Sequence, residues 1–213
     1  MVNYTAQFLT ICGLHLLAVA APGPDFAIVL RQSITHGRPS ALWTSVGIGS
    51  GILVHTSYSL LGIGLLVKSS LTAFTLMKIA AAAYLAWIGV KAMRAKPAAV
   101  DSIQTGTTPT PVPSGRSAFM IGFMTNALNP KATLFFLAVF SVVIDPQTPR
   151  LVQAGYGLWM AVMTAAWFSL VSLVFTQEPV RRAFLRLGHW FERAMGAVLL
   201  GLGVRLAFAS AGK

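Results

Sequence analysis

The sequence predicts an all-α membrane protein with about six transmembrane helices, arranged as two inverted repeats of three helices. Three observations lead to this prediction: the chain is strongly apolar, long apolar blocks recur along it, and proline interrupts two of these blocks. Of the 213 residues, 55% are hydrophobic and 10% are charged, whereas soluble domains carry about 25% charged residues. So few polar side chains cannot cover a soluble protein, and we expect much of the surface to face lipid.

The apolar blocks have the length of membrane-spanning helices. A bilayer core about 30 Å thick requires about 20 apolar residues per helix, and continuous runs favour helices over the short alternating strands of a membrane barrel. No positive charge precedes the first block, and its apolar pattern resumes after Pro24, so we expect it to be retained rather than cleaved as a signal peptide. The predicted spans are Tyr4–Leu30, Ala41–Val67, Leu71–Lys91, Ser117–Ile144, Val152–Thr176 and Arg186–Phe208.

The distribution of lysine and arginine predicts the orientation, because cytoplasmic connections carry an excess of these residues. If the first, third and fifth connections face the cytoplasm, that side holds the larger group: Arg31, Arg38, Lys91, Arg94, Lys96, Arg116, Arg181, Arg182, Arg186 and Arg193. The other side holds Lys68, Lys78, Arg150, Arg205 and Lys213. Both termini are therefore expected on the outer side of a bacterial inner membrane, away from the cytoplasm.

Similar segments in the two halves indicate an internal repeat. The segment 84–91 shares Leu, Gly, Val and a terminal cation with the segment 198–205, and the first and fourth spans both contain proline. We interpret residues 1–213 as a single domain with a first repeat at 1–95, a flexible loop at 96–116 and a second repeat at 117–213. Three helices are an odd number, so the second repeat is inverted, as in many secondary transporters.

The first proline break is Pro22-Gly23-Pro24, followed by Asp25. Proline lacks a backbone donor and glycine tolerates unusual dihedral angles, so the helix cannot continue undisturbed. Asp25 is the only acid well inside an apolar block, which makes it a functional candidate. The alternative is a helix cap paired permanently with a cation. The other acids are assigned to loops or helix ends: Asp101, Asp145, Glu178 and Glu192.

The second break contains Asn126, Asn129, Pro130 and Lys131. Lys131 has apolar neighbours and requires an anion, which is either Asp25 or a substrate carboxylate. Asn129 is expected to cap the following half-helix, whose free amides also favour anions. Together the two breaks suggest a site for a zwitterion, in which Asp25 takes an ammonium group and Lys131 a carboxylate. If the two charges only neutralise each other, exchanging them should leave transport largely intact.

Small residues and histidines in the other spans allow two interpretations each. Small residues let helices approach closely, so we assign a group of glycines to helix packing or to lining a pathway: Gly47, Gly49, Gly51, Gly89 and Gly203. The larger Tyr84 is assigned to the same two roles. His55 is either a proton relay within the site or a hydrogen-bonded packing residue, and His15 is similarly ambiguous.

Several functional classes lack their signatures. The net charge of +11 lies between apolar blocks rather than in a basic run, so no nucleic-acid partner is expected. The sequence contains no Walker A motif and no metal-ligand cluster, and a single cysteine, Cys12, excludes an intrachain disulfide. We expect no cofactor and no enzymatic activity, because an enzyme requires a convergent catalytic set and only His55 with Asp25 offers a pair.

In combination, these residues resemble the LysE/RhtB family of bacterial amino-acid exporters over nearly the whole chain. The motifs that carry the resemblance are Pro22-Gly23-Pro24-Asp25 with Arg31 and Gly37, the Gly47-x-Gly49-x-Gly51 helix, Lys78 to Tyr84-Leu85 with Gly89, Asn129-Pro130-Lys131-Ala132 with Phe135-Phe136, and Gly196 to Gly203. The resemblance implies a six-helix inner-membrane carrier that expels amino acids in exchange for protons, nearest to the threonine/homoserine branch.

Other functions remain open at this stage. Export of cationic amino acids requires a further intramembrane acid, and export of another metabolite or a metal ion, lipid handling and membrane enzymology are alternatives. The small-residue helix surfaces permit a homodimer.

Overall fold

The computed structural model describes residues 2–69, 71–95, 111–145, 147–174 and 177–208, and the regular structure within these ranges is entirely helical. The helical character predicted from the sequence is therefore confirmed for this part of the chain. Most of the connection predicted as a flexible loop, residues 96–110, lies outside it.

The first predicted span consists of two helices, α1 (Tyr4–Ala20) and α2 (Pro24–Thr35), which are bent by 52° at the break between them. Asn3 starts α1, since its side chain accepts a hydrogen bond from the backbone N–H of Ala6 at 3.0 Å. Pro24 starts α2, where its missing N–H costs nothing. Gly37, at φ 82°, then turns the chain into the next helix.

The fourth predicted span is broken in the same way. Its parts are α5 (Gly115–Ala127), α6 (Pro130–Ala138) and the π-helical turn η2 (Val139–Val143), with a bend of 54° between α5 and the rest. Asn129 caps α6, because its side-chain oxygen accepts a hydrogen bond from the backbone N–H of Lys131 at 3.0 Å.

The remaining helices are α3 (Arg38–Ser69), α4 (Leu71–Met93), α7 (Arg150–Val174) and α8 (Glu178–Phe208). The predicted start of the last helix at Arg186 is wrong: Pro179 lies in the first turn of α8, a position that tolerates proline. The placement of Glu192 in a loop or at a helix end is wrong for the same reason, since Glu192 lies within α8.

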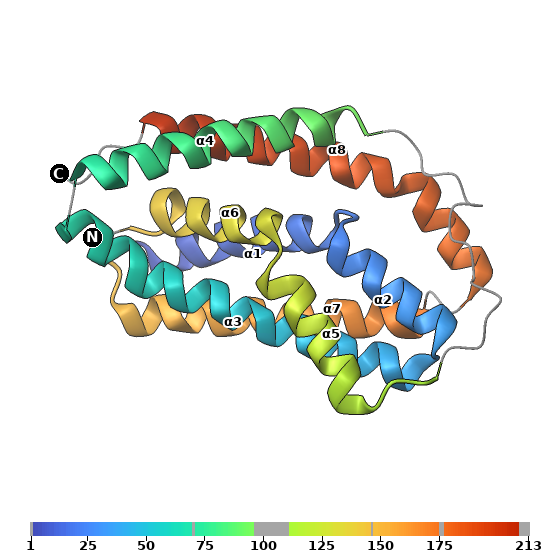
Figure 1. The fold of residues 1–213 in the computed structure, drawn as a ribbon. Coiled ribbons are helices and arrows are strands. Elements are labelled where there is room, and N and C mark those ends of the chain that lie inside the picture. Colours follow the sequence, from blue (N-terminus) through green and yellow to red (C-terminus); the bar gives the residue numbers. More distant parts are fainter. Residues whose placement is uncertain (1, 70, 96–110, 146, 175–176, 209–213) are drawn as a thin grey trace.

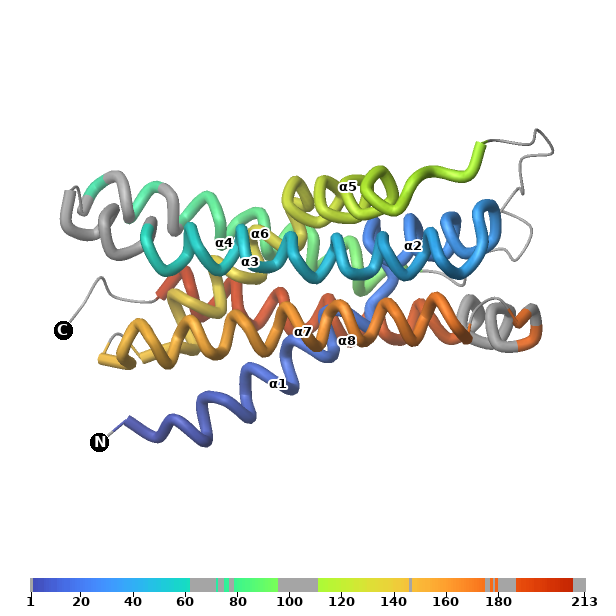
Figure 2. The backbone as a smooth tube through the Cα atoms, turned by 90° about the horizontal axis from the view of Figure 1, so that it is seen from below, coloured from blue at the N-terminus to red at the C-terminus, as the bar shows by residue number. Residues whose placement is uncertain are grey.

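Among the described residues, α7 is the one unbroken helix long and apolar enough to cross a membrane, and each of the two bent pairs meets the same criterion as a broken span. The helices form three groups (Figure 1): α4 and α8 run side by side along one edge, α3, α5 and α7 pack at the opposite edge together with α2, and α1 and α6 lie between. The start of α1 and the end of α8 lie at the same end of the bundle, also when it is seen from below (Figure 2).

Glycines allow α3 to pack closely against α5. A Cβ atom on Gly47 would collide with the backbone of Phe119 in α5, and one on Gly122 of α5 would collide with the backbone of Thr44. The hydroxyl of Thr44 crosses the same contact and donates to the carbonyl of Ala118 at 3.1 Å. Backbone-to-backbone packing of this kind is typical of membrane helices.

Glycines also allow close contacts between α3 and α7 and between α4 and α8. A Cβ atom on Gly49 would lie 2.7 Å from the carbonyl oxygen of Ala161 in α7, and one on Gly89 of α4 would lie 2.8 Å from the carbonyl oxygen of Gly196 in α8. Further along the α4–α8 contact, Gly203 faces the backbone of Ala82.

Candidate functional site

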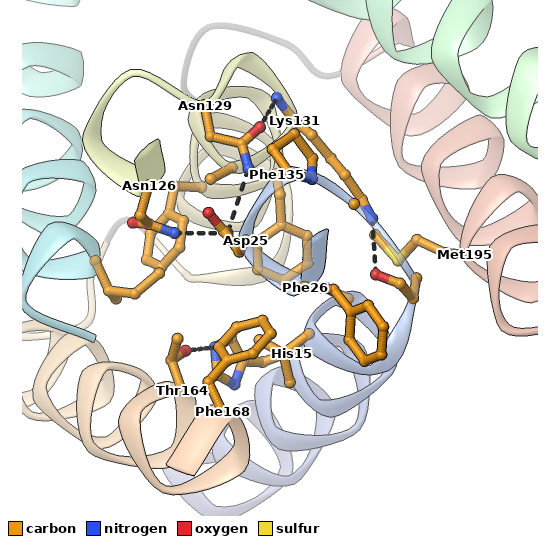
Figure 3. A pocket seen from close by; sticks show the side chains of 18 residues that line it. His15, Asp25, Phe26, Asn126, Asn129, Lys131, Phe135, Thr164, Phe168 and Met195 are labelled. Atoms are coloured by element: carbon orange, nitrogen blue, oxygen red, sulfur yellow. Dashed lines mark hydrogen bonds between the residues drawn. The ribbon is translucent and has the colours of Figure 1, made fainter. Parts of the chain in front are cut away.

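The two helix breaks meet at one small cavity of about 50 Å³. Asp25 reaches it from the first turn of α2, Asn126 from the last turn of α5, and Asn129 and Lys131 from the start of α6 (Figure 3). These side chains are far apart in the sequence. They converge because each proline break places a helix end, with its free backbone groups, at the centre of the bundle.

The carboxylate of Asp25 is held by two asparagines. Its Oδ2 accepts hydrogen bonds from the side-chain amide of Asn126 at 2.9 Å and from that of Asn129 at 3.3 Å (Figure 3). Its Oδ1 is buried and has no hydrogen-bond partner among the described residues. Asp25 also lies in the first turn of α2, where the helix dipole favours a negative charge. One carboxylate oxygen is thus fixed, and the other is left without a hydrogen bond.

Lys131 does not pair directly with Asp25. Within the described part of the chain the two side chains form no ion pair, and the Lys131 ammonium instead donates to the backbone carbonyl of Ala21 at 3.4 Å. The charge of Lys131 interacts electrostatically with Asp25 and also with Glu192 of α8. The asparagines donate to Oδ2 of Asp25 and Lys131 donates to a backbone carbonyl, so neither charge has the other as its hydrogen-bond partner.

His55 lies behind Asn126 rather than in the cavity. Its Nε2 donates to the backbone carbonyl of Asn126 at 2.9 Å, and its Nδ1 is 2.7 Å from the hydroxyl of Tyr58. The ring is fully buried and stacks on Phe136. Beneath the same asparagine, a Cβ atom on Gly51 would lie 2.7 Å from the side-chain oxygen of Asn126. Both residues therefore support the position of Asn126.

The opposite wall of the cavity contains His15, whose role the sequence left ambiguous, and Thr164, which the sequence did not single out. Nε2 of His15 is 2.9 Å from the hydroxyl of Thr164 in α7, and Nδ1 of His15 is buried without a partner among the described residues. Phe135 and Phe168 complete the apolar lining (Figure 3). The sequence gives little indication of a role for Thr164, because a single hydroxyl in an apolar helix is not distinctive.

A second, larger cavity adjoins the first and contains two further candidates. It measures about 510 Å³ and is lined by Tyr84 of α4 and Glu192 of α8, together with Lys131. Glu192 could have been found from spacing, since Glu192, Met195 and Leu199 recur at helical intervals and all line this cavity. The residues that line the two cavities do not include Gly47, Gly49, Gly51, Gly89 or Gly203.

Comparison with known proteins identifies the family. A family model described as LysE type translocator matches residues 16–210. The chain belongs to the LysE type translocator family. It is 31% identical to the threonine efflux protein of Escherichia coli K12 over 205 residues, which covers 93% of this chain and 96% of that protein. The threonine efflux protein of Salmonella typhi is 30% identical with the same coverage.

A second kind of relative matches over a shorter stretch. The homoserine/homoserine lactone efflux protein of Salmonella typhimurium is 35% identical over 133 residues, or 62% of each chain. These matches confirm the resemblance inferred from the sequence, and they confirm that this member of the LysE family is a helical membrane transporter rather than an enzyme. No solved structure gives a significant match to the chain.

Proposed function

We propose that this chain exports neutral amino acids or close derivatives, of the threonine, homoserine and homoserine lactone kind, by secondary active transport across the bacterial inner membrane. One observation carries the proposal: Asp25 and Lys131, which belong to two separate helix breaks, line the same cavity without pairing with each other. The threonine efflux and homoserine/homoserine lactone efflux proteins among the relatives support the substrate class.

The cavity chemistry fits a zwitterion. The unpartnered Oδ1 of Asp25 accepts a hydrogen bond from the α-ammonium group, and Lys131 and the first amides of α6 donate to the α-carboxylate. Asn126 and Asn129 keep the Asp25 carboxylate oriented during binding. A charge in apolar surroundings is costly unless it is paired. The substrate therefore supplies one opposite charge for each of the two protein charges.

The same pairing gives a reason for exchange with protons. When the ammonium group leaves Asp25, an unpaired carboxylate remains in low-dielectric surroundings. A proton bound at Oδ1 removes that charge and allows the empty carrier to return. Asp25 then holds the ammonium group and the proton in turn, which couples outward movement of the amino acid to inward movement of the proton.

The arrangement of the helices supports two inverted repeats, at 1–95 and 117–213, with six membrane passes. The broken pairs α1–α2 and α5–α6 have similar bends, 52° and 54°, and run in opposite directions through the bundle (Figure 1). The lysine and arginine distribution supports an orientation with both termini outside. A homodimer through small-residue helix surfaces remains a further prediction.

Glu192 favours a second candidate substrate class, the cationic amino acids. Their export requires a further acid near the site, and Glu192 interacts electrostatically with Lys131 across the larger cavity. A lysine or arginine substrate would place its side-chain cation against this carboxylate.

Efflux measured in a bacterial strain that lacks its own exporters tests the proposal. Cells are loaded through dipeptides with labelled threonine, homoserine or lysine, and efflux is followed with and without a proton uncoupler. We expect rapid loss of threonine or homoserine, slowed by the uncoupler and abolished in Asp25→Asn. Asp145→Asn removes a charge in a loop, where Oδ1 caps the N–H of Gln147, and is expected to export normally.

Each other result has a definite meaning. Export of lysine alone would replace the first substrate class with the second. Efflux no faster than in empty cells for all three amino acids would overturn the proposal. If the uncoupler does not slow export, proton coupling would no longer be part of the proposed function.

A further inference from the structure

The larger cavity lies between the α4–α8 pair and the two helix breaks. Its volume of about 510 Å³ falls within the range of about 300–1,000 Å³ that is typical of ligand pockets. The cavity beside Asp25 measures about 50 Å³, while one water requires about 10–15 Å³ by a similar measure. In this conformation the Asp25 cavity therefore has room for a few waters, whereas an amino acid fits the larger cavity.

The larger cavity has its own pair of opposite charges. Lys131 approaches it from α6 and Glu192 from α8, and the two interact electrostatically. Lys91 also lines it, with its ammonium group over the ring of Trp87 at 5.6 Å. The cavity thus offers a carboxylate for an ammonium group, cations for a carboxylate, and the aromatic walls of Tyr84 and Trp87 for a side chain.

The two cavities share a wall and a lysine. Gly23, Pro24, Asn129, Lys131 and Met195 line both of them. A Cβ atom on Gly23 would lie 3.6 Å from the Lys131 ammonium, so the lysine side chain passes directly beside this glycine. The hydrogen bond from that ammonium to Ala21 is long, at 3.4 Å, and restrains it weakly.

We propose that the cavity between α4 and α8 is a second amino-acid site, in which Glu192 binds the α-ammonium group and Lys131 the α-carboxylate. This second site rests on the proposed function, since the substrate is taken to be an amino acid. Lys131 retains the carboxylate while the ammonium group moves from one acid to the other, so the substrate is paired at both sites. Glu192 is a binding residue at the larger cavity, and Asp25 is its counterpart at the smaller one.

Cysteine protection tests for a ligand in this cavity directly. Ala92 lines it, whereas Val90 of the same helix is exposed and does not. In a Cys12→Ser background, Ala92→Cys and Val90→Cys are labelled with a small thiol reagent in membranes, with and without L-threonine or L-homoserine. We expect the amino acid to slow labelling at position 92 and not at position 90, and Glu192→Gln to remove the protection.

Transport kinetics of the same variants provide the second measurement. Loss of a hydrogen bond to a charged group costs about 1.5–3 kcal/mol, so Glu192→Gln is expected to raise the KM for efflux about tenfold or more. Glu192→Asp keeps the charge and should recover part of the affinity, which a merely structural role would not predict. Asp145→Asn is the matched control, and all variants are compared at equal amounts in the membrane.

The possible failures can be told apart. If wild type exports threonine or homoserine but neither protects position 92, the second site does not exist while the proposed function stands. Unchanged KM in Glu192→Gln leads to the same conclusion. If wild type exports no amino acid, the proposed function fails and the second site fails with it.

Discussion

His55 donates a hydrogen bond from Nε2 to the backbone carbonyl of Asn126, 2.9 Å away. That carbonyl also accepts from the backbone N–H of Asn129 at 2.8 Å. Because a carbonyl can only accept, Nε2 carries the hydrogen, and in the neutral ring Nδ1 accepts from the hydroxyl of Tyr58. His55 thus holds the backbone at the end of α5. This is where the chain leaves α5 between Asn126 and Asn129, the two asparagines that bind Asp25.

His55→Phe should lower stability and slow efflux without abolishing it. Phenylalanine keeps a ring against Phe136 but loses both hydrogen bonds, at a cost of about 1–3 kcal/mol in the free energy of unfolding. Efflux should fall less than in Asp25→Asn, because His55 contacts the site through Asn126. The checks are thermal unfolding in detergent and initial efflux rates. Abolished efflux with unchanged stability would instead support a proton relay through His55.

Exchanging the two buried charges, as Asp25→Lys with Lys131→Asp, should abolish efflux. The amides of Asn126 and Asn129 donate to Asp25, and in the exchanged protein these donors would face an ammonium group. The measurement is efflux at matched amounts of protein in the membrane, with each single variant alongside. Largely intact efflux in the exchanged protein would mean that the two charges only neutralise each other.

Gly51→Ala should impair the site from outside the cavity. The added Cβ atom would lie 2.7 Å from the side-chain oxygen of Asn126 and would displace it. Overpacking of this kind costs about 1–3 kcal/mol, and efflux should fall with it. Gly201→Ala is the matched control, because no described atom outside its own stretch of α8 lies within 4 Å of the added Cβ. Alanine there should be neutral or stabilise the helix by up to about 1 kcal/mol. Equal behaviour of the two variants would contradict the close contact.

Gly47→Ala and Gly122→Ala should each destabilise the contact between α3 and α5. Each added Cβ atom would collide with the backbone of the partner helix, and a backbone cannot move aside as a flexible side chain can. We expect a loss of about 1–3 kcal/mol for each. The double variant should lose less than the sum, because the first separation of the helices makes room for the second. Thermal unfolding of the three variants checks this, and a strictly additive result would argue against a shared contact.

The sequence predicted the features that depend on local chemistry. Proline at positions 22, 24 and 130 removes backbone donors, and helices end or begin beside these residues. Asn129 was expected to cap the second half-helix, and its side chain accepts the hydrogen bond from Lys131 N–H. Long apolar runs predicted an all-helical membrane protein, and the described residues and the family match agree with it.

The features that depend on packing could not be predicted in the same way. Asp25 and Lys131 were natural partners by charge, but the break between α5 and α6 brings the amides of Asn126 and Asn129 to Asp25 first. Glu192 was assigned to a loop or a helix end, because the predicted last span began only at Arg186. In the structure α8 begins at Glu178, and the fold places Glu192 near a lysine from a different helix.

The position of Lys131 in the wall between two cavities has a consequence for stoichiometry. One ammonium group fully neutralises one carboxylate, so an anion bound in either cavity lowers the affinity of the other for a second anion. The two cavities therefore compete for the charge of Lys131, while Lys91 adds a second cation to the larger cavity alone. We expect a second amino acid to bind more weakly than the first, so that the two sites are filled mainly one at a time.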